Sequence, residues 1–231
     1  MILSFMMMIL CGAVASLAYA ESVAKPLPPS LAMNTNTELS QKSTPAQDVA
    51  FLFYKLANMN PNFEKKITNT PSFRNASSDE QLKILREDVP MLQMGYRNFV
   101  PQMHKIIIRT KVGSKAIIGQ KNGVELSFGG DPKQPVYFPY AWGGDQFAVL
   151  ADGIDQFKFL PMKLETASRI SGKIDNDGQS TLLLELQPIK ADGRNPFPLD
   201  GVPQWLFMTN ISRAWLLNQY HEILWEYTAK P

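Results

Sequence analysis

Histidine is the side chain that most often carries general acid–base chemistry near neutral pH, and this chain has two, His104 and His221. They do not form the H-x-x-x-H pair of zinc proteases, and no G-x-S-x-G nucleophile motif is present. A serine, a histidine and an aspartate can still meet in space, because triads are defined by geometry rather than by order along the chain. We therefore interpret both histidines as surface or strand-end residues, with a dispersed catalytic site as the alternative.

A second candidate site is the segment from Phe128 to Phe147, in which two Gly-Gly-Asp triplets flank a run rich in aromatic residues. Rigid rings beside glycine and proline suit recognition of a peptide or a sugar, since they give contact area at low entropic cost. The predicted ligand-binding residues are Tyr137, Tyr140, Trp142 and Asp145. The alternative is an edge strand whose rings pack onto the core and whose glycines serve as bends.

We predict no metal and no cofactor. Asp175-Asn176-Asp177-Gly178 fails the EF-hand register, because Lys173 and Leu184 would occupy the first and last ligand positions. The same four residues are typical of a hairpin turn. The Gly-Gly pairs lack the lysine and the helix start that a phosphate-binding loop needs.

Residues 1–20 are typical of a cleavable signal peptide. They carry an apolar run from Phe5 to Leu10 and end in Ala18-Tyr19-Ala20, which fits an A-x-A cleavage site after Ala20. The run is shorter than the roughly 20 apolar residues of a membrane span, and no later segment is apolar enough to span a bilayer. The pattern predicts a mature protein in the periplasm or outside the cell. Cleavage removes Cys11, the single cysteine, so we expect no disulfide.

The charges are nearly balanced, with 23 basic and 21 acidic residues and a net charge of +2. This balance is too small to indicate the concentrated basic surface that a nucleic-acid-binding protein normally has, so we expect no nucleic-acid partner. Residues 21–43 are rich in proline and polar residues and predict a flexible leader. We expect residues 44–231 to form one domain.

Two helices are predicted at the start of this domain. Thr44-Pro45-Ala46-Gln47 combines an N-cap, a helix-starting proline and a capping-box glutamine, and predicts a helix from Pro45 to about Met59. Ser78-Asp79-Glu80-Gln81 predicts a second helix through Val89 to Tyr96, which Pro90 would kink or interrupt.

Beyond residue 105 the hydrophobic period shortens to two, which predicts strands at 106–112, 205–211 and 223–227. Asn122-Gly123 predicts one hairpin, and Asp175 to Gly178 predicts another between strands at 169–174 and 181–186. Residues 213–227 could form a helix, but tryptophan, tyrosine and isoleucine favour strand, turn and strand. The predicted fold class is α+β: N-terminal helices followed by a mostly antiparallel β-sheet or a sandwich-like β domain.

Two short motifs carry a resemblance to a known family. Gly95-Tyr96-Arg97-Asn98-Phe99 closes a predicted helix, and Glu222-Ile223-Leu224-Trp225-Glu226-Tyr227 forms a late strand. With this spacing, the stretch from Phe51 to Tyr227 resembles an uncharacterised family of exported or envelope-associated bacterial proteins, domain of unknown function 4852. The resemblance implies an envelope location and assigns no activity.

Three classes of function follow from these patterns. The export signal, the many strands and the absence of common catalytic motifs favour a non-catalytic binding or envelope-associated protein, whose partner would be an envelope protein, a peptide or a glycan. A hydrolase with a dispersed site, acting on cell-wall material or peptides, is the first alternative. A structural subunit of an envelope assembly is the second, and it would expose a large apolar patch.

Overall fold

The computed structural model describes residues 43–130, 134–174 and 177–230. The predicted signal peptide, nearly all of the predicted leader, and Asp175 and Asn176 lie outside the described residues. Helices gather in the N-terminal part, and one nine-stranded mixed sheet follows. The predicted α+β fold class is therefore confirmed.

Nearly all neighbouring strands of the sheet run antiparallel, and the exception is the parallel pair β4–β8. Seven strands follow the order β3-β4-β8-β6-β1-β2-β5, while β7 and β9 pair with β8 alone. The strands are β1 (Ile106–Ile117), β2 (Gly123–Ser127), β3 (Tyr137–Trp142), β4 (Asp145–Asp152), β5 (Phe159–Pro161), β6 (Gln179–Ala191), β7 (Phe197–Leu199), β8 (Val202–Leu217) and β9 (Ile223–Thr228).

The long strand β8 organises one half of this sheet. It pairs with β4 through residues 205–210 and with β9 through residues 213–217, and β6 runs along it from residue 207 to 217. A turn at residues 218–222 separates β8 from β9. Strand, turn and strand therefore occupy residues 213–227, as predicted, and the helical alternative is wrong.

The helix α2 (Ala46–Leu56) supplies the centre of the hydrophobic core. Its six consecutive residues from Val49 to Tyr54 are all buried, because the helix has the sheet on one side and other helices on another. The Phe51 ring meets the rings of Phe63, Tyr96, Phe99 and Trp142 edge-on.

The predicted cap of α2 does not form. Thr44 Oγ1 accepts a hydrogen bond from the backbone N–H of Ile107 at 2.7 Å, and the Thr44 N–H donates to the Ile107 carbonyl at 2.9 Å. The threonine therefore ties the start of the domain to β1. A distant backbone donor competes with the local one here, and the local sequence pattern contains no sign of it.

The helix α5 (Ser78–Asn98) runs without interruption through Pro90, so the predicted interruption is wrong. Pro90 and Arg86 both lie on the exposed side, where water can bond the Arg86 carbonyl that lacks its usual partner. The capping box is formed by Ser77 and Glu80, one residue before the predicted one.

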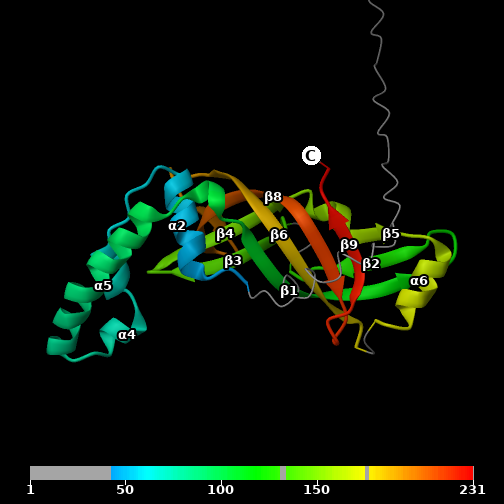
Figure 1. The fold of residues 1–231 in the computed structure, drawn as a ribbon, viewed down its shortest axis with the longest axis horizontal. Coiled ribbons are helices and arrows are strands. Elements are labelled where there is room, and N and C mark those ends of the chain that lie inside the picture. The colour runs from blue at the N-terminus through cyan, green and yellow to red at the C-terminus, as the bar shows by residue number, and fades with distance from the viewer. Residues whose placement is uncertain (1–42, 131–133, 175–176, 231) are drawn as a thin grey trace, which may run out of the picture.

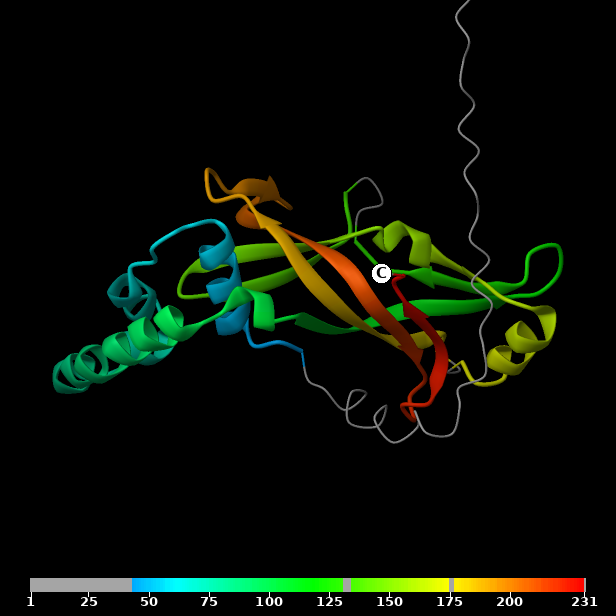
Figure 2. The ribbon, with the colours of Figure 1, turned by 45° about the horizontal axis from the view of Figure 1, so that its top comes forward.

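Two short helices, α3 (Phe63–Thr68) and α4 (Pro71–Arg74), pack against α5. We call α3, α4 and α5 the helical arm. Figures 1 and 2 show this arm extending from one end of the elongated sheet, while α6 (Leu164–Ser171) lies at the opposite end. Of the residues of α5, Tyr96 is the buried one, so most of this helix faces solvent. Two 3-10 turns, η2 (Pro101–Met103) and η3 (Ile154–Lys158), complete the regular structure.

The hairpins differ in detail from their sequence signals. β1 and β2 pair antiparallel as predicted, but five residues connect them and the Asn122 side chain accepts from the Gly119 N–H at 3.0 Å. The tight two-residue turn is instead Gly143-Gly144, with φ of +57° and +84°, between Trp142 and Asp145.

The strand predicted at residues 169–174 is wrong, because α6 includes residues 169–171 and turn or irregular residues follow it. Ala167 and Ile170 lie three residues apart and are both buried, which is helical spacing. The partner strand predicted at 181–186 is correct and lies within β6. The second predicted hairpin is therefore a helix-to-strand connection.

Helices in the described ranges are all too short or too polar to cross a membrane. The same ranges contain no group of three or more histidine, cysteine, aspartate and glutamate side chains that could hold a metal ion.

Candidate functional site

The predicted aromatic site lies on the β3–β4 hairpin, and alternation along β3 divides its rings. Tyr140 and Trp142 share a face with the buried Phe138 and pack against the core, whereas Tyr137 lies on the opposite face. The Tyr137 hydroxyl donates to Asp200 Oδ2 at 2.5 Å. The three rings therefore do not form one platform.

Trp142 and Tyr140 are both partly buried. The Trp142 ring lies 5.7 Å from Phe51 and 6.5 Å from Tyr54, measured between centroids. Burial raises the pKa of Tyr140 to about 12. This arrangement corresponds to the edge-strand alternative, in which the rings contribute to packing. Their role in ligand binding stays a prediction.

β3 is an edge strand of the sheet, and Pro139 protects it. Trp142 and Asp145 flank the two-residue turn as a hydrogen-bonded pair, so the backbone groups of residues 137, 139 and 141 point to the open edge. Proline has no N–H at that position. A strand added at this edge would therefore lack one backbone hydrogen-bond donor, at Pro139.

Asp145 belongs to a structural contact with the helical arm. Its Oδ2 accepts from the Tyr54 hydroxyl at 2.5 Å and contacts Lys66 Nζ at 2.5 Å. The Lys66 side chain is only 12% exposed. Burial, followed by the hydrogen bond to Asp145, raises the pKa of Tyr54 far above its ordinary value. We call Tyr54, Lys66 and Asp145 the Asp145 cluster; it joins α2, α3 and β4.

The neighbouring turn explains why two glycines precede Asp145. A Cβ atom on Gly143 would lie 2.7 Å from the Lys66 side chain, and one on Gly144 would lie 2.8 Å from the Asn69 side chain. Both glycines also have positive φ. The Gly-Gly-Asp triplet thus lets α3 pack closely onto the hairpin.

The two histidines lie in separate places and contact other kinds of groups. The His104 ring stacks on Phe99, with centroids 4.0 Å apart and planes 13° apart. His221 Nδ1 accepts a hydrogen bond from Arg109 Nη2 at 2.8 Å, because a guanidinium can only donate. None of these contacts pairs a histidine with a nucleophile or an orienting carboxylate.

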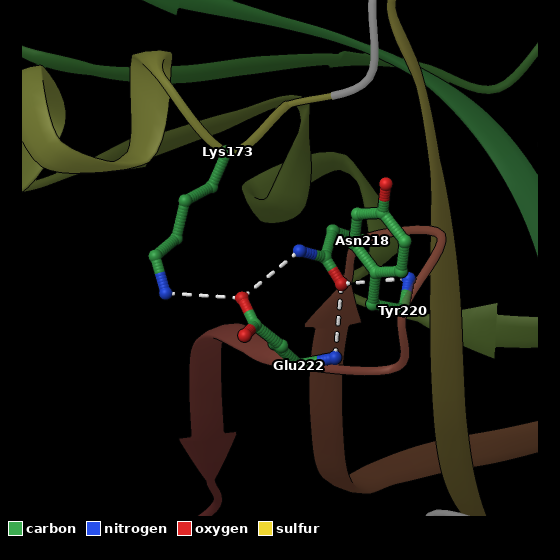
Figure 3. Close-up of polar contacts among 4 residues, drawn as sticks. All are labelled: Lys173, Asn218, Tyr220 and Glu222. Carbon is green, nitrogen blue, oxygen red and sulfur yellow. Dashed lines mark hydrogen bonds and ion pairs between the residues drawn. The ribbon is translucent and has the colours of Figure 1, made fainter.

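A polar hollow that the sequence did not suggest lies between the end of α6 and the β8–β9 turn (Figure 3). Its volume is about 370 Å³. We call it the turn hollow; it is lined by Gly172, Lys173, Ile174, Asn218, Gln219, Tyr220 and Glu222.

Asn218 holds the turn in shape. It is 3% exposed, and its Oδ1 accepts from the backbone N–H groups of Tyr220 at 3.0 Å and Glu222 at 2.9 Å. Its backbone N–H donates to the Glu222 carbonyl at 3.1 Å, and its carbonyl accepts from the His221 N–H at 3.0 Å. His221 adopts φ of 63°, a left-handed conformation that non-glycine residues seldom take. The buried amide therefore fixes the positions of the side chains that follow it.

Glu222 is the charged centre of the turn hollow. Its Oε2 accepts from Lys173 Nζ at 3.0 Å and from Asn218 Nδ2 at 3.1 Å, as Figure 3 shows. The hydrogen bond and positive charge of Lys173 lower the pKa of Glu222. Glu222 is therefore ionised near neutral pH, and its negative charge offsets the positive charge of Lys173.

Tyr220 is the most exposed aromatic side chain in the described residues, at 76%. Its backbone is held by Asn218, and in Figure 3 its ring lies on the Asn218 side, with the hydroxyl pointing away from the Lys173–Glu222 pair. An exposed tyrosine ring can both stack and hydrogen-bond. A short polar stretch between two strands was visible in the sequence, but Lys173 lies 49 residues from Glu222, and only the fold brings them together.

A second exposed feature lies on the helical arm and the turn after it. Of the twelve large apolar side chains that are exposed in the described residues, five fall between positions 82 and 103. We call them the arm patch: Leu82, Met91, Met94, Val100 and Met103. Methionine is common at surfaces that contact other proteins, because its flexible chain adapts to a partner.

A comparison of this chain with models of protein families, with curated proteins and with solved structures found no match. The resemblance to the uncharacterised envelope family therefore stays a prediction.

Proposed function

We propose that this chain is an exported, non-catalytic binding protein that acts in the periplasm or outside the cell and takes a peptide or a glycan in the turn hollow. The signal-like segment that ends in Ala18-Tyr19-Ala20 supports export. The proposal needs no metal and no cofactor.

The observation that carries this proposal is the composition of the turn hollow. An exposed Tyr220 ring, the ionised Lys173–Glu222 pair and the buried Asn218 amide meet at one shallow site. Polar groups held in fixed positions orient a ligand and give a binding site its specificity. The rigid turn reduces the entropy lost when a ligand binds.

Hydrolysis is less well supported by the contacts of the two histidines. A serine or water nucleophile needs a base within hydrogen-bond reach, and a third group normally orients that base. His104 instead stacks on Phe99, and His221 accepts from Arg109. The arginine occupies the ring nitrogen that a triad would give to a carboxylate.

A photocrosslinking experiment tests the binding function. A photoreactive phenylalanine derivative replaces Tyr220 in the tagged protein, which is then illuminated in its native envelope. As a matched control, the same derivative replaces Phe197, a half-exposed ring on β7. We expect covalent capture of a ligand at position 220 and none at position 197. Equal capture, or capture at neither position, contradicts the proposal.

The arm patch favours a second candidate function, a structural subunit of an envelope assembly. Exposed apolar side chains on a projecting element are typical of association surfaces. Replacing Met91 and Met94 by glutamine should then abolish association, measured by analytical ultracentrifugation of the exported protein. Replacing the similarly exposed Ile118, at the start of the β1–β2 connection, should not. Monomers before any substitution would exclude self-assembly through this patch.

A further inference from the structure

We infer that the turn hollow recognises an uncharged glycan, with Tyr220 as its stacking platform and Glu222 as its hydrogen-bond acceptor. The inference rests on the proposed binding function and adds the chemical class of the ligand. Four features of the turn hollow support it: its charge, its open polar atoms, its ring and its size.

The charge of the turn hollow favours a neutral ligand. Lys173 and Glu222 pair at 3.0 Å, so their charges cancel within the site. An anionic ligand would have to compete with Glu222 for the ammonium, and a cationic one would have to compete with Lys173 for the carboxylate. A neutral polyol needs neither exchange, since hydroxyl groups hydrogen-bond to both members of an intact ion pair.

The open atoms match sugar hydroxyls. Glu222 Oε2 receives two hydrogen bonds, while Oε1 accepts none from the described residues. The Tyr220 hydroxyl also lacks a hydrogen-bond partner within the ranges that the structure describes. The lining of the turn hollow therefore includes a carboxylate oxygen that accepts, a phenol that donates and accepts, and an ammonium with donors to spare. Hydrogen bonds to ionised groups are the stronger kind.

The Tyr220 ring supplies the apolar component. Sugar rings present C–H groups on one face, and these pack against the electron-rich face of an aromatic ring. Because the ring is 76% exposed while its backbone N–H is held by Asn218, it offers this face without large motion of the turn. Tyrosine pairs such a surface with a polar tip and has few torsions to order.

The same turn is poorly suited to a peptide. An extended peptide gains much of its affinity from backbone hydrogen bonds along a strand edge. In the turn hollow, the N–H groups of Tyr220, His221 and Glu222 and the carbonyls of Asn218 and Glu222 are already used inside the turn. Side chains, and not main-chain groups, are therefore what the site offers.

The size of the turn hollow limits the epitope. Its volume of about 370 Å³ is near the lower end of small-molecule sites, which span roughly 300 to 1,000 Å³. The site thus has room for one or two sugar units.

Titration of the exported protein with N,N′-diacetylchitobiose, cellobiose and maltose, followed by isothermal calorimetry, tests the inference. We expect saturable binding of at least one disaccharide. Tyr220→Ala should weaken it about tenfold or more, and Glu222→Gln should weaken it as well, because the amide pairs less strongly with hydroxyls and with Lys173. Phe197→Ala, which removes a half-exposed ring elsewhere, should leave it unchanged.

Thermal unfolding of each variant provides the control for folding, and Tyr220→Ala should keep the native midpoint because its ring is exposed. Absence of binding by all three disaccharides overturns the glycan inference, as does an unchanged affinity in Tyr220→Ala. Trialanine binding that depends on Tyr220 also overturns it, while leaving the proposed binding function intact. If the proposed binding function itself is wrong, and not only the glycan inference, then no ligand is captured by the photoreactive group at position 220 in the envelope.

Discussion

Removing the carboxylate of Asp145 tests whether this residue, predicted as part of a ligand site, is instead a structural contact. In Asp145→Ala, Lys66 would remain 12% exposed without its ion-pair partner, and Tyr54, which is 1% exposed, would lose the acceptor of its hydroxyl. Both losses disfavour the folded state, because a buried polar group without a partner keeps its full desolvation cost.

The magnitude follows from the burial of the cluster. Breaking a buried ion pair costs roughly 3 to 5 kcal/mol, whereas an exposed pair contributes about 0 to 1 kcal/mol. The Asp145 side chain is 21% exposed, so we expect the lower end of the first range, about 3 kcal/mol. For a domain of this size such a loss lowers the melting temperature by about 6 to 12 °C.

Urea denaturation of the native protein and of Asp145→Ala measures this loss of unfolding free energy directly. The matched control is Asp155→Ala, which removes a 2.7 Å ion pair with Lys158 whose side chains are 76% and 56% exposed. That variant should differ from the native protein by less than about 0.5 kcal/mol. Tyr54→Phe removes one hydrogen bond of the cluster and should cost about 1 kcal/mol. If Asp145→Ala were no more destabilising than Asp155→Ala, the structural reading of this cluster would be refuted.

Three further predictions concern packing, pH and export. Trp142→Ala should lower the free energy of unfolding, measured by urea denaturation, by about 2 to 3 kcal/mol, because the ring is partly buried against Phe51. A loss near zero would show that the ring does not contribute to the core. Burial by itself raises the pKa of Glu185, but hydrogen bonds from Lys105 and Ser212 and the charge of Lys105 outweigh it, and the folded-state pKa is lowered. The stability that Glu185 contributes is therefore fully present above its unfolded pKa of about 4.3 and is lost as the pH falls through the lower folded value. Glu185→Gln should remove this contribution and flatten the pH dependence of the melting temperature below pH 5. A melting profile that matches that of the native protein contradicts this prediction. Terminal sequencing of protein from its native host should give Glu21 as the first residue, and an intact Met1 would overturn export.

Secondary structure was predictable where the hydrophobic period was long and regular. The alternating residues of 106–112, 205–211 and 223–227 all lie in strands, because burial of one face of a sheet leaves a period of two in the sequence. Shorter or mixed segments were not predictable in the same way. Residues 169–171 lie in the eight-residue helix α6. Its two buried residues, Ala167 and Ile170, are too few to give a clear helical period of hydrophobic residues in the sequence.

Local motifs failed where a distant partner competed for the same group. Thr44 has the sequence of a helix cap, yet its hydroxyl accepts from Ile107, 63 residues away. The stronger signal for a tight turn was assigned to Asn122-Gly123, but Gly143-Gly144 forms it and also makes room for α3. In both cases the deciding contact comes from another element.

The sequence by itself determined the α+β class and the helices and strands whose hydrophobic period is long and regular, because these depend on local period and composition. Only the tertiary structure decided which of those residues act together. It placed Asp145 against Tyr54, 91 residues away, and Lys173 against Glu222, 49 residues away. Hydrogen bonds and ion pairs act over about 3 Å, so a site assembled from distant segments leaves no spacing in the sequence from which it can be recognised.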